Sequence, residues 1–286
     1  MSNITKTSKI VLITGSTSGI GRATVQELVK HASILILPVR NMIKGEELKK
    51  ELEAINPSCQ IDLFQCDLEF IESIKSSANL ILGKYRIIDT IINNAGIMEP
   101  DYRLTDDNIE AHFQVNVLSQ YIFNTILTPL VVASSAGRII NLSSMAHQNA
   151  KFELDSIQAQ TNKVLIGVGL YSNSNLYRNL LTFRLAKELA DTNVTVNCLH
   201  PGIIRTNLGS QTQNKLWKVL LHIFYIFTKP ASEGAKTSIH LALSQEAGQI
   251  TGKYWSNCKV VQSSELSLNM ELANQLAKKC KELTGV

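Results

Sequence analysis

The sequence predicts an α/β fold, a doubly wound parallel sheet with helices on both faces. Three observations carry this prediction. Apolar runs of strand length alternate strictly with longer segments of helical period, and these runs are nearly continuous in apolar residues. Continuous apolar strands are typical of parallel sheets covered on both faces. No repeat, low-complexity tract or Pro/Gly/Ser linker divides the 286 residues, which favours a single domain.

The expected elements follow the chain in alternation. Strands are expected at 9–14, 33–39, 60–66, 87–95, 137–144 and 193–200. Helices are expected between them, at 21–32, 43–55, 68–85, about 104–134 and 176–191. Residues 205–230 follow the last strand and are expected to form a lid over the site, whereas 231–286 form a C-terminal part.

Composition indicates a globular chain without a nucleic-acid partner. Hydrophobic residues make up 44% and charged residues 18%, values typical of a folded domain. The net charge is +4, and the basic residues are scattered. The lysine pairs at 49–50 and 278–279 have acidic neighbours, which is typical of solvated helix faces.

Cysteine use and hydropathy indicate a cytoplasmic protein. The five cysteines form no CxxC pair and no metal-ligand spacing, so we expect reduced thiols and no metal site. Residues 1–10 lack the apolar core of a signal peptide. The run "LWKVLLHIFYIF" at 216–227 is shorter than the ~20 residues of a span. A helix that covers the substrate is the favoured interpretation, and peripheral membrane contact is the alternative.

A glycine-rich turn follows the first expected strand. The segment "VLITGSTSGIGRATVQELV" places Gly15, Gly19 and Gly21 between an apolar strand and an amphipathic helix. Glycines permit a tight turn, and without Cβ atoms they let the backbone approach a pyrophosphate at the helix N-terminus. The sequence therefore favours a bound dinucleotide and a Rossmann-type fold over a turn without a ligand.

The end of the second strand indicates which dinucleotide. Arg40 and Asn41 stand where such folds meet the adenosine ribose, and Arg22 follows the last glycine of the turn. An acidic residue there suits a free 2′-hydroxyl, whereas arginine suits a 2′-phosphate. Solvated surface arginines are the alternative. The sequence favours NADP(H) over NAD(H).

Small and polar residues follow the third and fourth strands. Asp67 could accept a hydrogen bond from the adenine amine, or it could cap the following helix. Asn93, Ala95 and Gly96 come at the carboxyl end of the fourth strand, where ligands bind open α/β sheets. Small side chains there would permit a close approach of the cofactor.

Two further polar positions are candidates for chemistry. Ser143 and Ser144 end the fifth strand and point to opposite sides, because strand side chains alternate. Asn116 lies in an apolar helical segment, where an unpaired amide would be costly. No Gly-x-Ser-x-Gly elbow occurs, which disfavours a nucleophilic hydrolase.

Together these motifs resemble the short-chain dehydrogenase/reductase family over nearly the whole chain. "TGSTSGIG" (14–21), "CDL" (66–68), "NNAG" (93–96), "QVNVLS", "NLSS" and "LHPGIIRTNL" (199–208) occur in the family's order. The resemblance selects Ser144 to bind the substrate oxygen and Asn116 for a proton relay. It implies cofactor contacts at Gly15, Ser16, Ser18, Gly19, Ile20, Gly21, Arg22, Arg40, Asn41, Asp67, Leu68, Asn93, Ala95, Gly96, Tyr171, Asn175, Pro201, Gly202 and Thr206.

The resemblance is greater to the branch of retinol dehydrogenases and WW-domain oxidoreductases. "NLSSMAH", "EGAKTSIHLALS", "GKYWSNCK" and the spacing between Ser144 and Tyr171 carry it. This branch implies NADP(H)-linked interconversion of alcohols and carbonyls on apolar substrates. Family members are commonly dimers or tetramers, so a homo-oligomer is expected. The resemblance also implies a single domain over 1–286, with the dinucleotide-binding core at about 9–200.

The departure from the family lies on one helix. In the family a tyrosine moves the proton on the substrate oxygen, and a lysine four residues later favours its phenolate form and binds the ribose. Here Tyr171 is followed by Asn175. A free tyrosine titrates near pH ~10, far from neutrality. Asn175 can donate hydrogen bonds but carries no charge, and Arg178 is expected to lie too far along the helix to replace the lysine.

Two hypotheses follow from this departure. The first is an NADP(H)-dependent oxidoreductase with weakened activity, whose catalytic set is Tyr171, Ser144, Asn116 and Asn175. The second is an NADP(H)-binding pseudoenzyme that acts as a sensor or interaction module. The retained Tyr171, Ser144 and Asn116 favour the enzyme, whereas Asn175 favours the pseudoenzyme. The apolar residues of the lid, Leu216, Trp217, Leu220, Phe224 and Phe227, are expected to form an apolar pocket wall.

Overall fold

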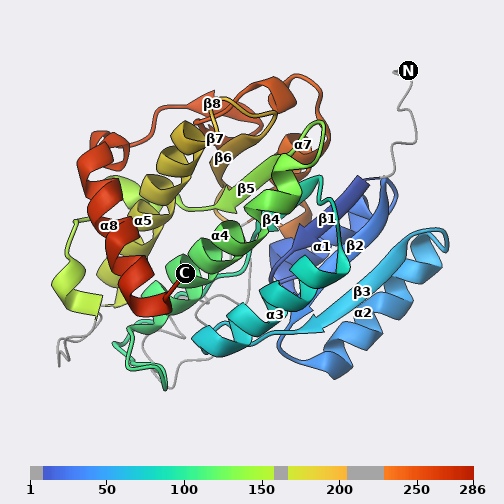
Figure 1. The fold of residues 1–286 in the computed structure, drawn as a ribbon, viewed down its shortest axis with the longest axis horizontal. Helices are drawn as coiled ribbons and strands as arrows, with labels where there is room; N and C mark the ends of the chain where they lie inside the picture. The colour runs from blue at the N-terminus through green and yellow to red at the C-terminus, as the bar shows by residue number, and fades with distance from the viewer. Residues whose placement is uncertain (1–8, 158–166, 205–228) are drawn as a thin grey trace.

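An eight-stranded sheet forms the middle layer of the computed structural model, which describes residues 9–157, 167–204 and 229–286. The strand order is β3-β2-β1-β4-β5-β6-β7-β8 (Figure 1). All neighbours pair in parallel except β7 and β8, which are antiparallel. The strands are β1 Lys9–Ile13, β2 Ala32–Val39, β3 Gln60–Gln65, β4 Thr90–Asn93, β5 Arg138–Leu142, β6 Thr195–His200, β7 Tyr254–Ser256 and β8 Lys259–Val261.

Helices cover both faces of the sheet. α3, α4, α5 and α8 pack on one face, and α1, α2 and α7 pack on the other (Figure 1). Their bounds are α1 Gly19–Leu28, α2 Met42–Ile55, α3 Ile71–Lys84, α4 Ser119–Val132, α5 Gly167–Glu188, α7 Ala231–Leu243 and α8 Met270–Thr284, and a π-helical turn at Phe113–Leu118 leads into α4. The predicted fold class is confirmed.

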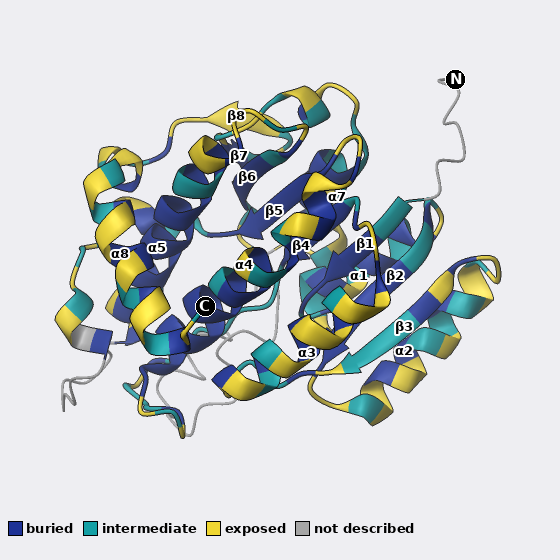
Figure 2. Ribbon diagram, in the orientation of Figure 1, coloured by how far each residue is buried: buried dark blue, intermediate teal, exposed yellow. Residues whose placement is uncertain are grey.

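Two apolar cores result from the alternation of strand side chains. Val11 and Ile13 of β1 belong to the core under α1, α2 and α7, whereas Leu12 between them belongs to the core under α3, α4, α5 and α8. All three side chains are buried. Because both faces are covered, the central strands β4 and β5 are buried, whereas β3 and β8 at the two edges of the sheet and the outer faces of the helices are more exposed (Figure 2).

The predicted strands are all present, with differences at their ends. The fourth strand is shorter than expected, because Asn94 turns its N–H back to the carbonyl of Ile92 and ends the pairing. α5 begins at Gly167, so it includes Tyr171 and Asn175 as well as most of the helical segment expected at 176–191. The hairpin of β7 and β8 was not among the predicted strands. Its turn holds Asn257 and Cys258 at φ of 48° and 59°, the left-handed geometry that joins tight hairpins.

One helical stretch within the described ranges is long and apolar enough to cross a membrane by length and composition alone. It runs from Phe113 to Val132 with a mean hydropathy of 1.4, and 67% of it is buried inside the fold. This burial is typical of a helix that covers a sheet in a protein core. The stretch therefore carries no argument for a membrane span.

Candidate active site

A cleft of about 610 Å³ opens at the carboxyl ends of the central strands. The strand order reverses there, because the chain continues from β1 outward to β2 and later returns to β4 on the other side. Ligands bind open α/β sheets at this switch point. The cleft is lined by residues 15–21, 38–40, 66–69, 94–99, 142–145 and 200–204, together with Val115, Tyr171 and Arg178.

The glycine-rich turn forms the floor of the cleft. Gly15 and Gly19 have φ of +67° and +53°, a region that glycine adopts without steric cost. Gly21 lies so close to the turn that a Cβ there would be 2.1 Å from the carbonyl oxygen of Gly15. Asn94 donates from Nδ2 to the carbonyls of Thr14 and Gly15, at 2.9 and 3.2 Å, and so holds the turn against β4.

The turn fits the pyrophosphate of a dinucleotide. Ser16 is fully buried in the cleft wall, and its Oγ has no hydrogen-bond partner among the described residues. Ser18 precedes α1 without a side-chain cap, and the first turn of α1 has no acidic residue. The free N–H groups and the positive end of the helix dipole therefore face the cleft, and both favour an anion.

The two arginines expected near the adenosine ribose lie in different places: one lines the cleft and the other does not. Arg40 lines the cleft with a side chain that is 58% exposed, and its Nη1 lies 3.7 Å from Oε1 of Glu69. Arg22 is outside the cleft lining and forms an ion pair with Glu51 of α2. Asn41 caps α2, accepting from the backbone N–H of Lys44 at 3.0 Å. Of these predicted contacts, the structure brings only Arg40 to the cleft.

Asp67 and Leu68 line the cleft wall that follows β3. The Asp67 carboxylate accepts from the N–H of Glu69 at 3.1 Å, inside a turn. The N–H of Ile71 at the start of α3 is instead bound by Asp107, at 2.8 Å. Asp67 therefore does not cap α3, and it lines the cavity that the adenine is predicted to enter.

Residues after β4 take different roles. Ala95 and Gly96 line the cleft. Asn93 lies in the buried interior, where its Nδ2 donates to the side chains of Asn124 and Asn141, both at 2.8 Å. The structure thus removes Asn93 from the cleft and places Asn94 there. Sequence reasoning missed Asn94, although its position inside "NNAG" is a signal that could have found it.

Ser143, Ser144 and Tyr171 all line the cleft. Ser144 Oγ accepts from the N–H of Ala146 at 3.2 Å, which leaves its hydroxyl proton available. Ser143 Oγ donates to the carbonyl of Asn175 at 3.3 Å and thereby ties β5 to α5. The predicted pair Ser144 and Tyr171 is brought together in one cavity.

Asn116 and Asn175 are not in the cleft lining. Asn116 lies in the π-helical turn, where its side chain accepts from Ile97 N–H at 2.8 Å and donates to the Ile97 carbonyl and to Ser174 Oγ, both at 3.0 Å. Asn175 is 1% exposed, and its Nδ2 donates to the carbonyl of Tyr171 at 2.8 Å. In this arrangement the Asn175 amide is used inside its own helix, and its contact with a ribose stays a prediction.

Arg178 lines the cleft that also contains Tyr171. Its Nε donates to the Asn116 carbonyl at 2.6 Å, its Nη1 to the Leu142 carbonyl at 2.7 Å, and its Nη2 to the Ala95 carbonyl. Arg178 follows Tyr171 by seven residues on α5, and its long side chain nevertheless reaches the cleft.

The segment after β6 completes the described part of the cleft. Pro201 and Gly202 line it, and Gly202 has a φ of +94°. Thr206 lies outside the described residues. The same holds for most of the predicted lid, including Leu216, Trp217, Leu220, Phe224 and Phe227.

Two histidines lie at the Ser144 side of the cleft: His200 is half-buried and lines it, and His147 is buried. His200 accepts at Nδ1 from the N–H of Met145 at 3.3 Å. His147 donates from Nδ1 to the Ser144 carbonyl at 2.7 Å and accepts at Nε2 from Ser264 N–H at 3.2 Å. Burial, and secondly the nearby His147, lower the pKa of His200 to about 4. Burial also lowers the pKa of His147.

The lowered pKa of His200 predicts a pH dependence of stability. An exposed histidine has a pKa of ~6.5, so between that value and about 4 the unfolded chain binds a proton that the folded protein excludes. The contribution of His200 is therefore complete above pH ~6.5 and is lost as the pH falls toward 4. We expect urea unfolding midpoints to fall across this window, and less steeply in His200→Asn, whose side-chain oxygen can replace Nδ1 as acceptor. Equal slopes in both proteins would contradict this assignment.

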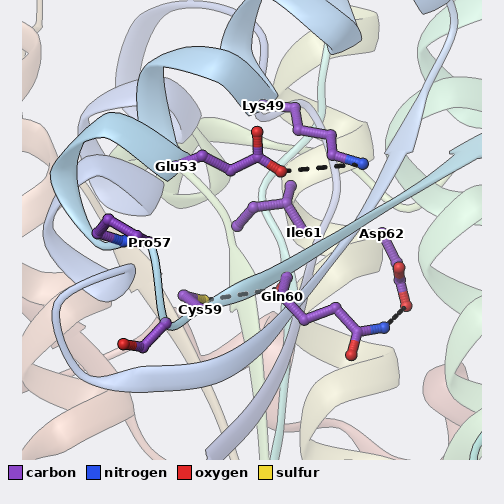
Figure 3. A pocket seen from close by; sticks show the side chains of 8 residues that line it. Lys49, Glu53, Pro57, Cys59, Gln60, Ile61 and Asp62 are labelled. Carbon is purple, nitrogen blue, oxygen red and sulfur yellow. Dashed lines mark hydrogen bonds and ion pairs between the residues drawn. The ribbon is translucent and has the colours of Figure 1, made fainter.

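A second hollow, of about 400 Å³, lies between α2 and the start of β3 (Figure 3). Its polar groups are paired: Lys49 lies 4.0 Å from Glu53, and Gln60 donates to Asp62 at 2.8 Å. Burial raises the pKa of the Cys59 thiol to about 11, which keeps it protonated near neutrality. This hollow has no group prepared for chemistry.

A glycine-rich turn at the topological switch point of a doubly wound sheet defines the class of α/β dinucleotide-binding proteins. The family model described as short chain dehydrogenase matches residues 9–217. The chain belongs to the short-chain dehydrogenase family, within its retinol-dehydrogenase-like branch. It is an NAD(P)-dependent oxidoreductase for an alcohol or carbonyl substrate.

Curated relatives and solved structures agree with this assignment. Retinol dehydrogenase 12 of Mus musculus is 34% identical over 99% of this chain and 89% of its own length. Retinol dehydrogenase 13 of Homo sapiens is 32% identical over 100% of this chain and 87% of its own length. A Mycobacterium paratuberculosis protein of solved structure shares the fold with a TM-score of 0.75, 23% identity and coverage of 97% and 94% of the two chains. A short chain dehydrogenase from Burkholderia cenocepacia in complex with NADP has a TM-score of 0.67, 20% identity and coverage of 86% and 95%.

Proposed function

We propose that this protein uses NADP(H) to interconvert an apolar alcohol and its aldehyde or ketone. The observation that carries the proposal is the shared cleft, which is lined by Tyr171 and Ser144 as well as by the glycine-rich turn. Proton donors and a dinucleotide site are thus joined in one cavity. We further propose that residues 1–286 form one domain, with the cofactor core at about 9–200 and the lid at about 205–230, and that the protein is a cytoplasmic homo-oligomer.

Four residues of the cleft have a defined part in this chemistry. A bound nicotinamide supplies or accepts the hydride. Ser144 donates a hydrogen bond to the substrate oxygen and orients it. Tyr171 moves the proton: during reduction its hydroxyl gives a proton to the oxygen of the carbonyl, and during oxidation its phenolate takes the proton from the alcohol. Ala95 has only a methyl side chain and Gly96 has none, so both leave room for a ring to approach the strand ends.

Arg40 supports the preference for NADP(H). Arg40 follows the second strand and lines the cleft. No acidic residue stands at 40 or 41 to accept a hydrogen bond from a free 2′-hydroxyl. Glu69 lies 3.7 Å away and is also paired with Arg103 at 2.7 Å, so Arg40 is free to turn toward a phosphate. Arg22, paired with Glu51, adds little.

The cleft walls support an apolar substrate. The relatives of this chain described above are retinol dehydrogenases, which suggests a long isoprenoid alcohol or aldehyde as the substrate class. Apolar side chains gather on the walls beside Tyr171, namely Ile97, Met98, Val115, Leu142, Met145, Ile203 and Ile204.

The alternative is an NADP(H)-binding pseudoenzyme that acts as a sensor or interaction module. One observation favours it: the Asn175 amide is bonded to the Tyr171 carbonyl and lies outside the cleft lining. A protein of this kind would bind the cofactor without turning over any carbonyl substrate.

Cofactor binding and turnover test the proposal together. We expect NADPH to raise the melting temperature more than NADH at equal concentration, because stabilisation follows the ratio of ligand concentration to Kd. Arg40→Gln should weaken NADPH binding by about tenfold, the loss of one charged hydrogen bond of ~1.5 kcal/mol, and leave NADH unchanged. NADPH oxidation with all-trans-retinal and with smaller apolar aldehydes then measures turnover.

Arg22→Gln is the matched control, since it removes a neighbouring arginine that is outside the cleft lining. Stabilisation by NADH that equals or exceeds that by NADPH would contradict the cofactor preference. Intact NADPH binding without turnover of any aldehyde or alcohol would favour the pseudoenzyme.

A further inference from the structure

The helix that carries Tyr171 contains a buried cation two turns further along. Tyr171, Asn175 and Arg178 are spaced i, i+4 and i+7 on α5, so they share one helix face. The two outer residues line the cleft, whereas the Asn175 side chain is bonded to its own helix. We infer that Arg178 supplies to Tyr171 the positive charge that position 175 lacks. This inference rests on the proposed function.

The guanidinium of Arg178 is held in place by three parts of the chain. It binds the carbonyls of Ala95 after β4, Asn116 in the π-helical turn and Leu142 at the end of β5. A guanidinium has more N–H donors than these contacts use. Gly96 allows this arrangement, because a Cβ there would lie 3.4 Å from Nη1 of Arg178 and 3.2 Å from Oδ1 of Asn116. The cation is therefore fixed among the strand ends that line the site.

No carboxylate neutralises this cation within the described part of the chain. Arg178 is 5% exposed, and its bonds to protein go to neutral carbonyls. A buried charge is costly unless it is paired, which favours an anion in the same cavity. Burial lowers the pKa of Arg178 to about 10, and the nearby Tyr171 acts against this shift. The guanidinium thus stays charged at neutral pH.

Other titratable groups around Tyr171 do not provide a fixed positive charge. The ring of His112 is 6.3 Å from that of Tyr171, and its Nδ1 is bonded to the buried Glu110 at 2.6 Å. His200 and Glu99 line the cleft, and the lowered pKa of His200 keeps it neutral. Tyr254 of β7 also interacts with Tyr171, and burial raises its pKa.

The consequence concerns the proton transfer. During oxidation the substrate O–H bond breaks and its proton joins the Tyr171 phenolate, while the hydride from carbon leaves to the oxidised nicotinamide. A fixed cation in the cavity favours the phenolate over the phenol and so raises the fraction of enzyme that can accept the proton. An adjacent opposite charge moves such an equilibrium by ~1–3 pH units.

A charge-exchange cycle tests the inference. Four proteins are compared: the unchanged chain, Arg178→Gln, Asn175→Lys, and the double variant. Arg178→Gln is expected to lower the rate of alcohol oxidation at neutral pH by about 10–100-fold. The pH at which this rate increases should rise by about 1–2 units. The double variant should recover most of this loss. Asn175→Lys should raise the rate of the unchanged chain far less than it raises the rate of Arg178→Gln, because a cation is already present there and repels a second one.

Two further variants separate charge from structure. Arg178→Lys keeps the charge and should retain more activity than Arg178→Gln, even where both are less stable. Arg184→Gln removes an arginine of the same helix that pairs with Glu188 outside the cleft, and its pH profile should not move. A large gain from Asn175→Lys alone, with a profile unchanged by Arg178→Gln, would overturn the inference.

A titration of Tyr171 in the absence of cofactor tests the role of Arg178 separately from the proposed function, because it does not depend on turnover. The near-ultraviolet phenolate signal of Tyr171 is obtained by subtracting the titration of Tyr171→Phe. We expect this signal to appear at higher pH in Arg178→Gln than in the unchanged chain. That result with no turnover in any variant would reject the proposed function and retain the electrostatic pair. An unmoved signal would reject the role of Arg178.

Discussion

Replacing Tyr171 with phenylalanine is expected to lower turnover by about 10²–10⁴-fold and to leave cofactor binding intact. Tyr171 lines the cleft and is the residue to which the proposed mechanism assigns the proton, and a positioned acid or base contributes this much to a reaction. The variant loses one oxygen atom, so the packing of α5 is preserved. Turnover is measured with saturating NADPH, and binding is measured by thermal shift.

Tyr121→Phe is the matched control for this prediction. Its hydroxyl donates to the carbonyl of Val286 at 3.0 Å, outside the cleft lining, so the same atom is removed without touching the site. Turnover in this control should equal that of the unchanged chain. Tyr171→Phe with full turnover would show that the proton moves by another route.

Gly21→Ala is expected to abolish cofactor binding and to destabilise the fold by about 3 kcal/mol or more. The added Cβ would lie 2.1 Å from the Gly15 carbonyl oxygen and 2.5 Å from Nδ2 of Asn94. The first of these contacts is to backbone, so the whole turn must move to relieve it. Urea unfolding measures the stability, and thermal shift with NADPH measures the binding.

Gly83→Ala provides the comparison for the glycine turn. Gly83 is an exposed residue of α3, and a Cβ there would meet nothing within 4 Å. Alanine is a better helix former than glycine, so this variant should gain up to ~1 kcal/mol and bind NADPH normally. A Gly21→Ala protein that matched it in stability and binding would contradict the close packing of the turn.

The fold could be predicted because its main signal is local. Continuous apolar strands that alternate with helix-length segments allow few arrangements other than a parallel sheet. The hairpin of β7 and β8 could not be predicted in the same way. Its strands have three residues each, and their pairing depends on β6, which is distant in the sequence.

The places of the site residues in the fold could be predicted better than the directions of their side chains. Sequence motifs locate a turn or a strand end, and this was enough to assign Gly15, Ser144 and Tyr171 to the cleft. The direction of a side chain depends on which tertiary partners reach it. Asn175 turns to its own helix and Arg22 turns to Glu51, whereas Arg178 extends into the cleft. Spacing along one helix does not contain that information.

The buried amide of Asn93 has a consequence for how the catalytic helix is held. It bonds Asn141 of the next strand, Asn141 Nδ2 donates to Thr182 Oγ1 at 2.9 Å, and Thr182 Oγ1 donates to the carbonyl of Arg178 at 2.6 Å. This series of hydrogen bonds runs through the buried interior from β4 through β5 to α5. The bond between Asn141 and Thr182 is the link of this series that joins the sheet to α5. A slide of α5 along the sheet by even one residue would break it and leave the buried Asn141 amide without this acceptor, at a cost of roughly 1–3 kcal/mol. These hydrogen bonds thus fix the position of α5 along the sheet, and with it the position of Tyr171.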